Sequence, residues 1–270
     1  MRDVSFGQYY PSDSFVHKCD PCIKLLFLIL YIVALFLAKN FYALGASAFV
    51  FLLIAISAGV PFKSLLRSVK AVLFLVLFTA ILNLFLYKGG TTLWQWGAIR
   101  IAKEGVYAMV FLSARLFLLV LGSALLTLTT APVALADGIE SLLSPLKLIR
   151  VPVHAFALIV SIALRFIPIL TDETSRIMNA QKARGADFES GNLFQRVKAV
   201  IPILIPLLIS AFCRANELGD AMEARCYTGS KVRTKYKKRT FTWRDLIAFL
   251  LGAVLLTGVI LLKIYTPPLI

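Results

Sequence analysis

The chain is poor in the residues that most enzyme and metal sites use. Its 270 residues include only two histidines, four cysteines and 14 acidic side chains. Histidine is the commonest general acid and base, and metal sites need clusters of histidine, cysteine or carboxylate ligands. The sequence also has no Gly-x-x-x-x-Gly-Lys phosphate loop, no His-Glu-x-x-His and no Gly-x-Ser-x-Gly. We therefore expect no catalytic residue, no metal site and no bound cofactor in this chain.

The cysteines form the one pattern that could suggest a metal or redox site. Cys19 and Cys22 have the required spacing and His17 lies close by, but the only other histidine is His154. A metal site would need a second pair of ligands. We expect all four cysteines to be unpaired thiols on the cytoplasmic side, where disulfides are disfavoured.

Apolar residues, in contrast, are abundant. They make up 59% of the chain, and the mean hydropathy is +0.83. A chain this apolar belongs in a lipid bilayer. The formal net charge of +15 then indicates cytoplasmic loops rich in Lys and Arg rather than a nucleic-acid partner. The predicted class is an all-α integral membrane protein.

Five apolar stretches are long enough to span a bilayer, and they cover residues 22–38, 41–60, 69–87, 105–130 and 246–264. Most of the basic residues lie between 144 and 244, which places that region in the cytoplasm, with the N-terminus inside and the C-terminus outside. We expect three parts. Residues 1–143 hold an N-terminal segment and four spans, residues 144–230 a cytoplasmic coupling module, and residues 231–270 a basic segment and the last span.

The coupling module contains two more apolar runs, 151–170 and 199–212. The first carries Arg165 and Pro168, the second carries Pro202 and Pro206, and each passes into charged residues without a turn signal. We predict two helices of about 30 residues each, lying along or below the membrane. Pro168 is expected to kink the first helix, and Arg165 to clamp neighbouring helices or contact a lipid phosphate. The alternative is that both runs are short spans joined by a cytoplasmic hairpin.

Small residues predict where these two helices cross, because alanine allows close approach of two backbones. The expected faces are Ala155, Ala163, Ala180 and Ala183 on the first helix, and Ala211, Ala215, Ala221 and Ala224 on the second.

Each of the two helices is predicted to end in an Ala-Arg motif, Ala183-Arg184-Gly185 in the first and Ala224-Arg225-Cys226 in the second. An arginine at a helix tip presents a planar fork of donors to an acidic groove. Taken alone, Arg184 before Gly185 is also an ordinary helix end, since glycine adopts the left-handed conformation and a cation complements the helix dipole. That conformation costs Cys226 about 1 kcal/mol, so the second helix has the alternative of continuing toward Gly229.

Several stretches together resemble the EcfT family, the transmembrane T components of energy-coupling-factor (ECF) importers for vitamins and metals. They are Gly7 to Pro11 with Ser14 to His17 and Asp20-Pro21, Thr129 to Pro132 with Ile139-Glu140 and Pro145-Leu146, Ala163 to Pro168, Gln181 to Gly185, and Ala221 to Arg225. The resemblance covers nearly the whole chain.

The resemblance implies that the two long helices cross and that their arginine tips dock in two cytosolic ABC-type ATPase subunits. It also implies that an apolar face of the chain holds a membrane-embedded, substrate-binding S component. The family usually has glycine after the second arginine, where this chain has Cys226. The predicted function is a non-catalytic scaffold subunit of an ATP-driven micronutrient importer in a prokaryotic cell membrane.

A second interpretation is a membrane enzyme or a standalone carrier that uses Arg115 or Arg165 to hold an anionic substrate. Proton-coupled carriers usually have carboxylates inside the membrane, and none of the five predicted spans has one. This absence favours the scaffold.

Overall fold

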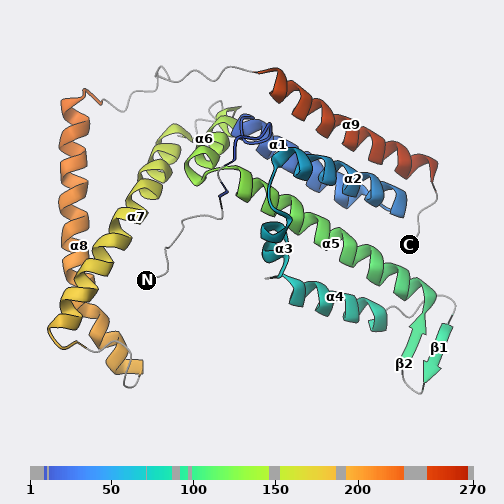
Figure 1. The fold of residues 1–270 in the computed structure, drawn as a ribbon, viewed down its shortest axis with the longest axis horizontal. Coiled ribbons are helices and arrows are strands. Elements are labelled where there is room, and N and C mark those ends of the chain that lie inside the picture. Colours follow the sequence, from blue (N-terminus) through green and yellow to red (C-terminus); the bar gives the residue numbers. More distant parts are fainter. Residues whose placement is uncertain are drawn as a thin grey trace. The chain divides into compact units, whose positions relative to one another are not determined.

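The computed structural model describes residues 9–10, 12–70, 72–86, 92–96, 99–145, 153–186, 193–227 and 242–266. The chain divides into two compact units (Figure 1). The first unit combines Met1–Pro145 with Arg239–Ile270, and the second is Leu146–Lys238.

The first unit is helical apart from one hairpin. Its helices are α1 (Pro21–Leu37), α2 (Phe41–Ala58), α3 (Phe62–Lys70), α4 (Leu73–Leu86), α5 (Lys103–Thr129), α6 (Pro132–Leu142) and α9 (Trp243–Tyr265). Strands β1 (Thr92–Trp96) and β2 (Ile99–Ala102) pair in antiparallel fashion between α4 and α5. The all-α class is confirmed, and the hairpin is a local addition that the sequence pattern did not indicate.

Helix α1 lies at the centre of the first unit, in contact with α2, α5, α6 and α9 (Figure 1). Three glycines permit this close packing. A Cβ atom on Gly122 of α5 would lie 2.7 Å from the ring of Tyr31, and one on Gly138 of α6 would lie 3.1 Å from the carbonyl carbon of Pro21. A Cβ on Gly252 of α9 would lie 3.1 Å from the Phe27 ring. All three distances from such a Cβ atom are shorter than normal packing distances. Glycine at these positions therefore allows α5, α6 and α9 to approach α1 closely.

The first helix begins at a network of carboxylates and backbone amides. Asp20 caps α1 by accepting from the amide of Cys22 at 2.8 Å. Asp245, which is 2% exposed, accepts from the amide of Asp20 at 2.8 Å and from the amide of Thr242 at 3.0 Å. The second of these bonds belongs to the capping box of α9. One buried carboxylate therefore ties the start of the last helix to the start of the first.

The predicted spans agree with the helices in part. Five helices are long and apolar enough to cross a membrane, but they are α2, α5, α9 and the two long helices of the second unit. Helix α1 has 17 residues, at the lower limit for a span. The predicted span 69–87 corresponds mainly to α4, an apolar helix of 14 residues. Taken together, α3 and α4 meet the length and hydropathy of a span, with a bend of 60° between them.

The second unit consists of two long helices that contact each other, α7 (Val153–Ala183) and α8 (Leu193–Ala224) (Figure 1). They have 31 and 32 residues, which confirms two helices of about 30 residues. Their apolar windows meet the length and hydropathy of a membrane span, so composition does not exclude the alternative in which both cross the bilayer.

The alanine faces do not form the contact between α7 and α8. Seven of the eight alanines are exposed, and only Ala211 is half-buried. The described polar link is instead an ion pair in which Nη2 of Arg214 lies 3.3 Å from Oε2 of Glu173. The prediction was wrong because helical spacing of small residues occurs on more than one face of a long helix, and only one face meets the neighbour.

Candidate functional site

The end of α7 is a complete Schellman motif. Gly185 has a φ of +86°, and its amide donates to the carbonyl of Lys182 at 3.0 Å. The next amide, that of Ala186, donates to the carbonyl of Gln181 at 3.0 Å. These two bonds satisfy carbonyls that would otherwise end the helix without partners. Arg184 is thus the cap residue of α7, and the helix ends there.

The end of α8 repeats this motif around Cys226. Cys226 has a φ of 57°, the one positive φ of a non-glycine residue in the described part of the chain. Its amide donates to the carbonyl of Glu223 at 2.8 Å, and the amide of Tyr227 donates to Met222 at 3.0 Å. The alternative that α8 continues toward Gly229 is therefore wrong, because the helix ends at Ala224 and Cys226 has left-handed backbone. The hydrogen bonds of the motif offset the cost of left-handed backbone at a cysteine.

The side chains of Arg184 and Arg225 are exposed at the two helix ends. Ala183 and Ala224 before them are exposed as well. Within the described residues, neither guanidinium makes a hydrogen bond or an ion pair. Each presents donors that match a carboxylate in a bidentate manner. Two equivalent cationic tips at the ends of two long helices are suited to binding acidic grooves.

The remaining predicted residues lie along α7 and α8. Pro168 is inside α7, and Pro202 and Pro206 are inside α8. All three prolines and Arg165 are exposed. Arg165 makes no hydrogen bond or ion pair with a described residue, so a clamp made by this side chain within the chain is not supported.

Arg115 makes a hydrogen bond to the backbone of another helix end. Its Nη2 donates to the carbonyl of Ala38, the residue that ends α1. Its guanidinium carbon also lies 4.7 Å from the centroid of the Phe111 ring. A cation on the last carbonyls of a helix complements the helix dipole. This arrangement explains a charge within an apolar helix without an anionic substrate.

The structure brings two of the resembling stretches together at the start of α1. The Nε2 atom of His17 lies 2.9 Å from the carbonyl of Tyr10, and its Nδ1 lies 2.6 Å from Oγ of Ser14. Because a carbonyl only accepts, Nε2 carries the proton and Nδ1 accepts from Ser14. Burial lowers the pKa of His17, which keeps it neutral in this role. The amide of Tyr10 then donates to the carbonyl of Leu128, near the end of α5, at 2.9 Å.

Lys24 completes this junction, and its role is not evident from the sequence. A lysine near a predicted span end suggested a side chain reaching toward water, yet Lys24 is only 8% exposed. Its Nζ donates to the carbonyls of His17 at 3.2 Å and of Thr129 at 3.1 Å. Thr129 is the last residue of α5. Only the fold shows that the first turn of α1 meets the end of α5.

Cys19 lies at the same junction and is buried. Its Sγ donates to the carbonyl of Phe15 at 3.4 Å. Burial raises the pKa of the Cys19 thiol, and the nearby Asp245 raises it further. A thiol with a raised pKa is a weak nucleophile and a weak metal ligand. Within the described part of the chain, the four cysteines are free and no cluster of three metal-ligating side chains occurs.

Comparison with known proteins gives a consistent result. A family model, CbiQ, described as cobalt transport protein, matches residues 12–236. The energy-coupling factor transporter transmembrane protein EcfT of Ruminiclostridium cellulolyticum is 46% identical over 263 residues, which cover 97% of this chain and 98% of that protein. The proteins of the same name from Brevibacillus brevis and Clostridium kluyveri are 48% and 47% identical, covering 94% and 98% of this chain and 96% and 98% of their own lengths. The chain therefore belongs to the EcfT family, the transmembrane proteins of energy-coupling factor transporters.

Proposed function

We propose that this chain couples two cytosolic ABC-type ATPase subunits to a membrane-embedded S component that binds a vitamin or other micronutrient. The observation that carries the proposal is the matched pair of helix ends. Arg184 and Arg225 occupy the same cap position of the same turn motif, and both are exposed without intramolecular partners among the described residues. ATP hydrolysis would take place in the partner subunits, and this chain would transmit the motion.

The ATPases would dock at the two tips, one at each. A guanidinium that leaves water for an acidic groove forms charge-assisted hydrogen bonds, which resist sliding better than apolar contacts do. The tips differ in the residue after the arginine, Gly185 or Cys226, and in the residue two positions before it, Lys182 or Glu223. Because the two tips differ, we propose that each binds a different ATPase subunit.

The S component would contact apolar surface that the chain leaves uncovered. Along α8, the exposed large apolar side chains include Leu204, Ile205, Leu208, Ile209 and Phe212. A continuous apolar face of this kind is typical of a contact with a protein partner or with lipid. The same helix ends at Arg225, so it would connect the S component to an ATPase directly.

The orientation follows from charge. We place the chain in the plasma membrane of a prokaryote, with the N-terminus and both arginine tips in the cytoplasm and the C-terminus outside. If α7 and α8 both crossed the bilayer as successive spans, the C-terminus would stay outside, but Arg184 and Arg225 would lie on opposite sides of the membrane. The proposed docking at both tips therefore requires that the two helices do not both cross.

An affinity purification tests the docking sites. The tagged chain would be isolated from its native membrane in mild detergent, as wild type and with Arg184→Glu plus Arg225→Glu. We expect the wild type to retain two ABC-type ATPases and a small membrane protein, and the variant to lose the ATPases. A control with Arg67→Glu plus Arg176→Glu changes the charge equally at exposed arginines away from the tips. Retention of the ATPases by the tip variant, or their loss from the control as well, would contradict the proposal.

A crosslink tests whether the helices move. Glu173 and Arg214 contact each other across α7 and α8, so Glu173→Cys plus Arg214→Cys, with the native cysteines replaced by serine, reports on this contact. We expect the yield of disulfide to differ between the nucleotide-free and ATP-bound complex, because a change in crossing would alter the distance between the two positions. Equal yields in every nucleotide state would exclude motion at this contact.

A further inference from the structure

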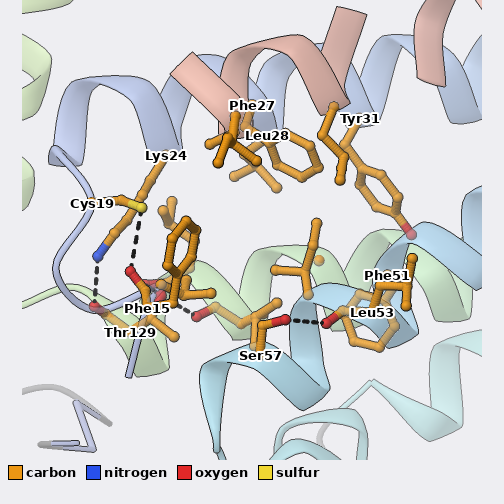
Figure 2. A pocket seen from close by; sticks show the side chains of 18 residues that line it. Phe15, Cys19, Lys24, Phe27, Leu28, Tyr31, Phe51, Leu53, Ser57 and Thr129 are labelled. Carbon is orange, nitrogen blue, oxygen red and sulfur yellow. Dashed lines mark hydrogen bonds between the residues drawn. The ribbon is translucent and has the colours of Figure 1, made fainter. Parts of the chain in front are cut away.

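The first unit contains a cavity that the proposed coupling role does not use. It has a volume of about 190 Å³ and lies among α1, α2, α5 and α9 and the turn before α1 (Figure 2). Its walls are mainly apolar and include Phe27, Leu28, Ile54, Leu125 and Leu251. For comparison, an apolar cavity of about 150 Å³ holds a benzene molecule. The space is therefore large enough for a segment of hydrocarbon chain.

The cavity is accessible from the outer surface of the unit. Two of its lining residues, Phe15 and Leu53, are 42% and 44% exposed. Leu53 belongs to α2, a helix long and apolar enough to lie in the bilayer. A lipid chain beside α2 would thus reach the cavity without crossing water.

One end of the cavity holds a buried cation. Figure 2 shows the Lys24 side chain directed to Thr129 at this end. An ammonium group has three donors, and among the described residues Lys24 uses two of them, both on backbone carbonyls. Neither of the described ion pairs involves Lys24. Two nearby carboxylates, those of Asp20 and Asp245, accept from backbone amides.

The far end of the cavity is formed by Tyr31 (Figure 2). Tyr31 follows Lys24 by seven positions on α1, which corresponds to about 10 Å along the helix axis. The cavity is thus an elongated slot beside α1, with a charge at one end and apolar walls beyond it. Arg244 adds a second cation near the charged end, where its guanidinium lies 5.8 Å from the centroid of the Phe15 ring.

We propose that this slot binds one acyl chain of an anionic phospholipid, with the phosphate beside the free donor of Lys24. Lys24 lies in the first turn of an apolar helix, at the level where lipid headgroups are found. An unfilled apolar cavity destabilises a protein in proportion to its volume, so a hydrocarbon chain in the slot is favourable. The site does not depend on ATPase docking, because every residue that lines it belongs to the first unit.

Native mass spectrometry of the delipidated full chain, with phosphatidylglycerol or phosphatidylcholine added back, tests the site. We expect phosphatidylglycerol to be retained about five- to tenfold better. Both lipids have a phosphate that can accept from Lys24, but only phosphatidylcholine also brings a cation close to Lys24 and Arg244, and these like charges repel each other. Leu53→Trp fills the mouth of the slot and should remove this retention. Leu52→Trp is the matched control, because Leu52 is also exposed on α2 but does not line the cavity.

Two further arms sharpen the result. Oleate, a free fatty acid, also combines an acyl chain with an anionic group. If the wild type retains oleate, and Leu53→Trp but not Leu52→Trp loses it, the slot binds a free fatty acid. Lys24→Gln should abolish the preference for phosphatidylglycerol, and if that variant does not fold, the two tryptophan variants still decide. Equal retention of both phospholipids, or equal loss with Leu52→Trp and Leu53→Trp, would overturn the proposal.

Discussion

Both units contain apolar helices of membrane-span length, but the two units bury them to different extents. In the first unit, the apolar windows of α2 and α5 are 28% and 33% buried within the chain, whereas those of α7 and α8 are each 6% buried. The hydropathy of α7 is nevertheless close to that of α2. Apolar composition alone thus does not distinguish a helix that packs inside its own chain from one that presents its surface to a lipid or a partner.

The difference has a physical cause. Helix α1 is held by glycines of three other helices and by buried polar contacts at its start, so the first unit has a core of its own. In the second unit, the described polar link between the helices is the partly exposed pair Glu173 and Arg214, which is of the kind that contributes about 1 kcal/mol or less. The first unit therefore has a packed core, whereas α7 and α8 leave many large apolar side chains exposed.

The largest predicted difference between the two units is the loss of stability when a buried carboxylate of the first unit is removed. Asp245→Ala leaves the amides of Asp20 and Thr242 without their acceptor, and the loss should destabilise the first unit by about 2–3 kcal/mol. Thermal unfolding of the purified chain in detergent measures this effect. Asp220→Ala in α8 is the matched control, because Asp220 is exposed and its loss should change stability by about 0.5 kcal/mol or less. Similar shifts for both variants would show that the first unit has no special polar junction.

The same glycine substitution should have opposite effects in the two units. Gly122→Ala places a Cβ 2.7 Å from the buried Tyr31 ring, and this overpacking should cost about 1–3 kcal/mol. A Cβ atom at Gly219 in α8 would meet nothing within 4 Å, so Gly219→Ala should stabilise its helix by up to about 1 kcal/mol. Hydrogen exchange of the amides of α5 and α8 measures both effects. Loss of protection in both helices would mean that α8 is as tightly packed as α5.

The sequence predicted the features that depend on local pattern. Apolar runs located α2, α5 and α9, and the passage from apolar to charged residues located α7 and α8. The glycine after Arg184 correctly indicated the end of α7. Each of these features depends on residues close together in the chain, where propensity and helix-end chemistry act.

Features that depend on long-range contacts were not predicted. The burial of Lys24 requires the end of α5, and the role of Asp245 requires the start of α1, 225 residues away. The alanine faces of α7 and α8 failed for the same reason, because helical spacing describes a face but not its neighbour. The bend between α3 and α4 lies close to the start of the predicted span 69–87, and apolar composition does not locate the residue at which one helix ends and the next begins.

The smallest predicted effect concerns the residue that follows the arginine at each helix end, Gly185 in one and Cys226 in the other. Cys226→Gly removes the strain of a left-handed cysteine and should stabilise the end of α8 by about 1 kcal/mol. Gly185→Ala introduces the same strain at the end of α7 and should destabilise it by a similar amount. The amides of Tyr227 and Ala186 report on the two ends, because each donates the outer hydrogen bond of its turn. Exchange should become about fivefold slower at Tyr227 and about fivefold faster at Ala186.

Cys213 provides the control for this experiment, since it is a second exposed cysteine of the same helix. Cys213 lies in the helical interior of α8, where glycine is less favourable than cysteine, so Cys213→Gly should speed exchange of the neighbouring amides. One substitution made at two positions of one helix should thus have opposite signs, because backbone conformation and not side-chain contact decides the outcome. If Cys226→Gly also speeds exchange at Tyr227, the cysteine side chain itself stabilises the tip, and backbone conformation would not decide the outcome.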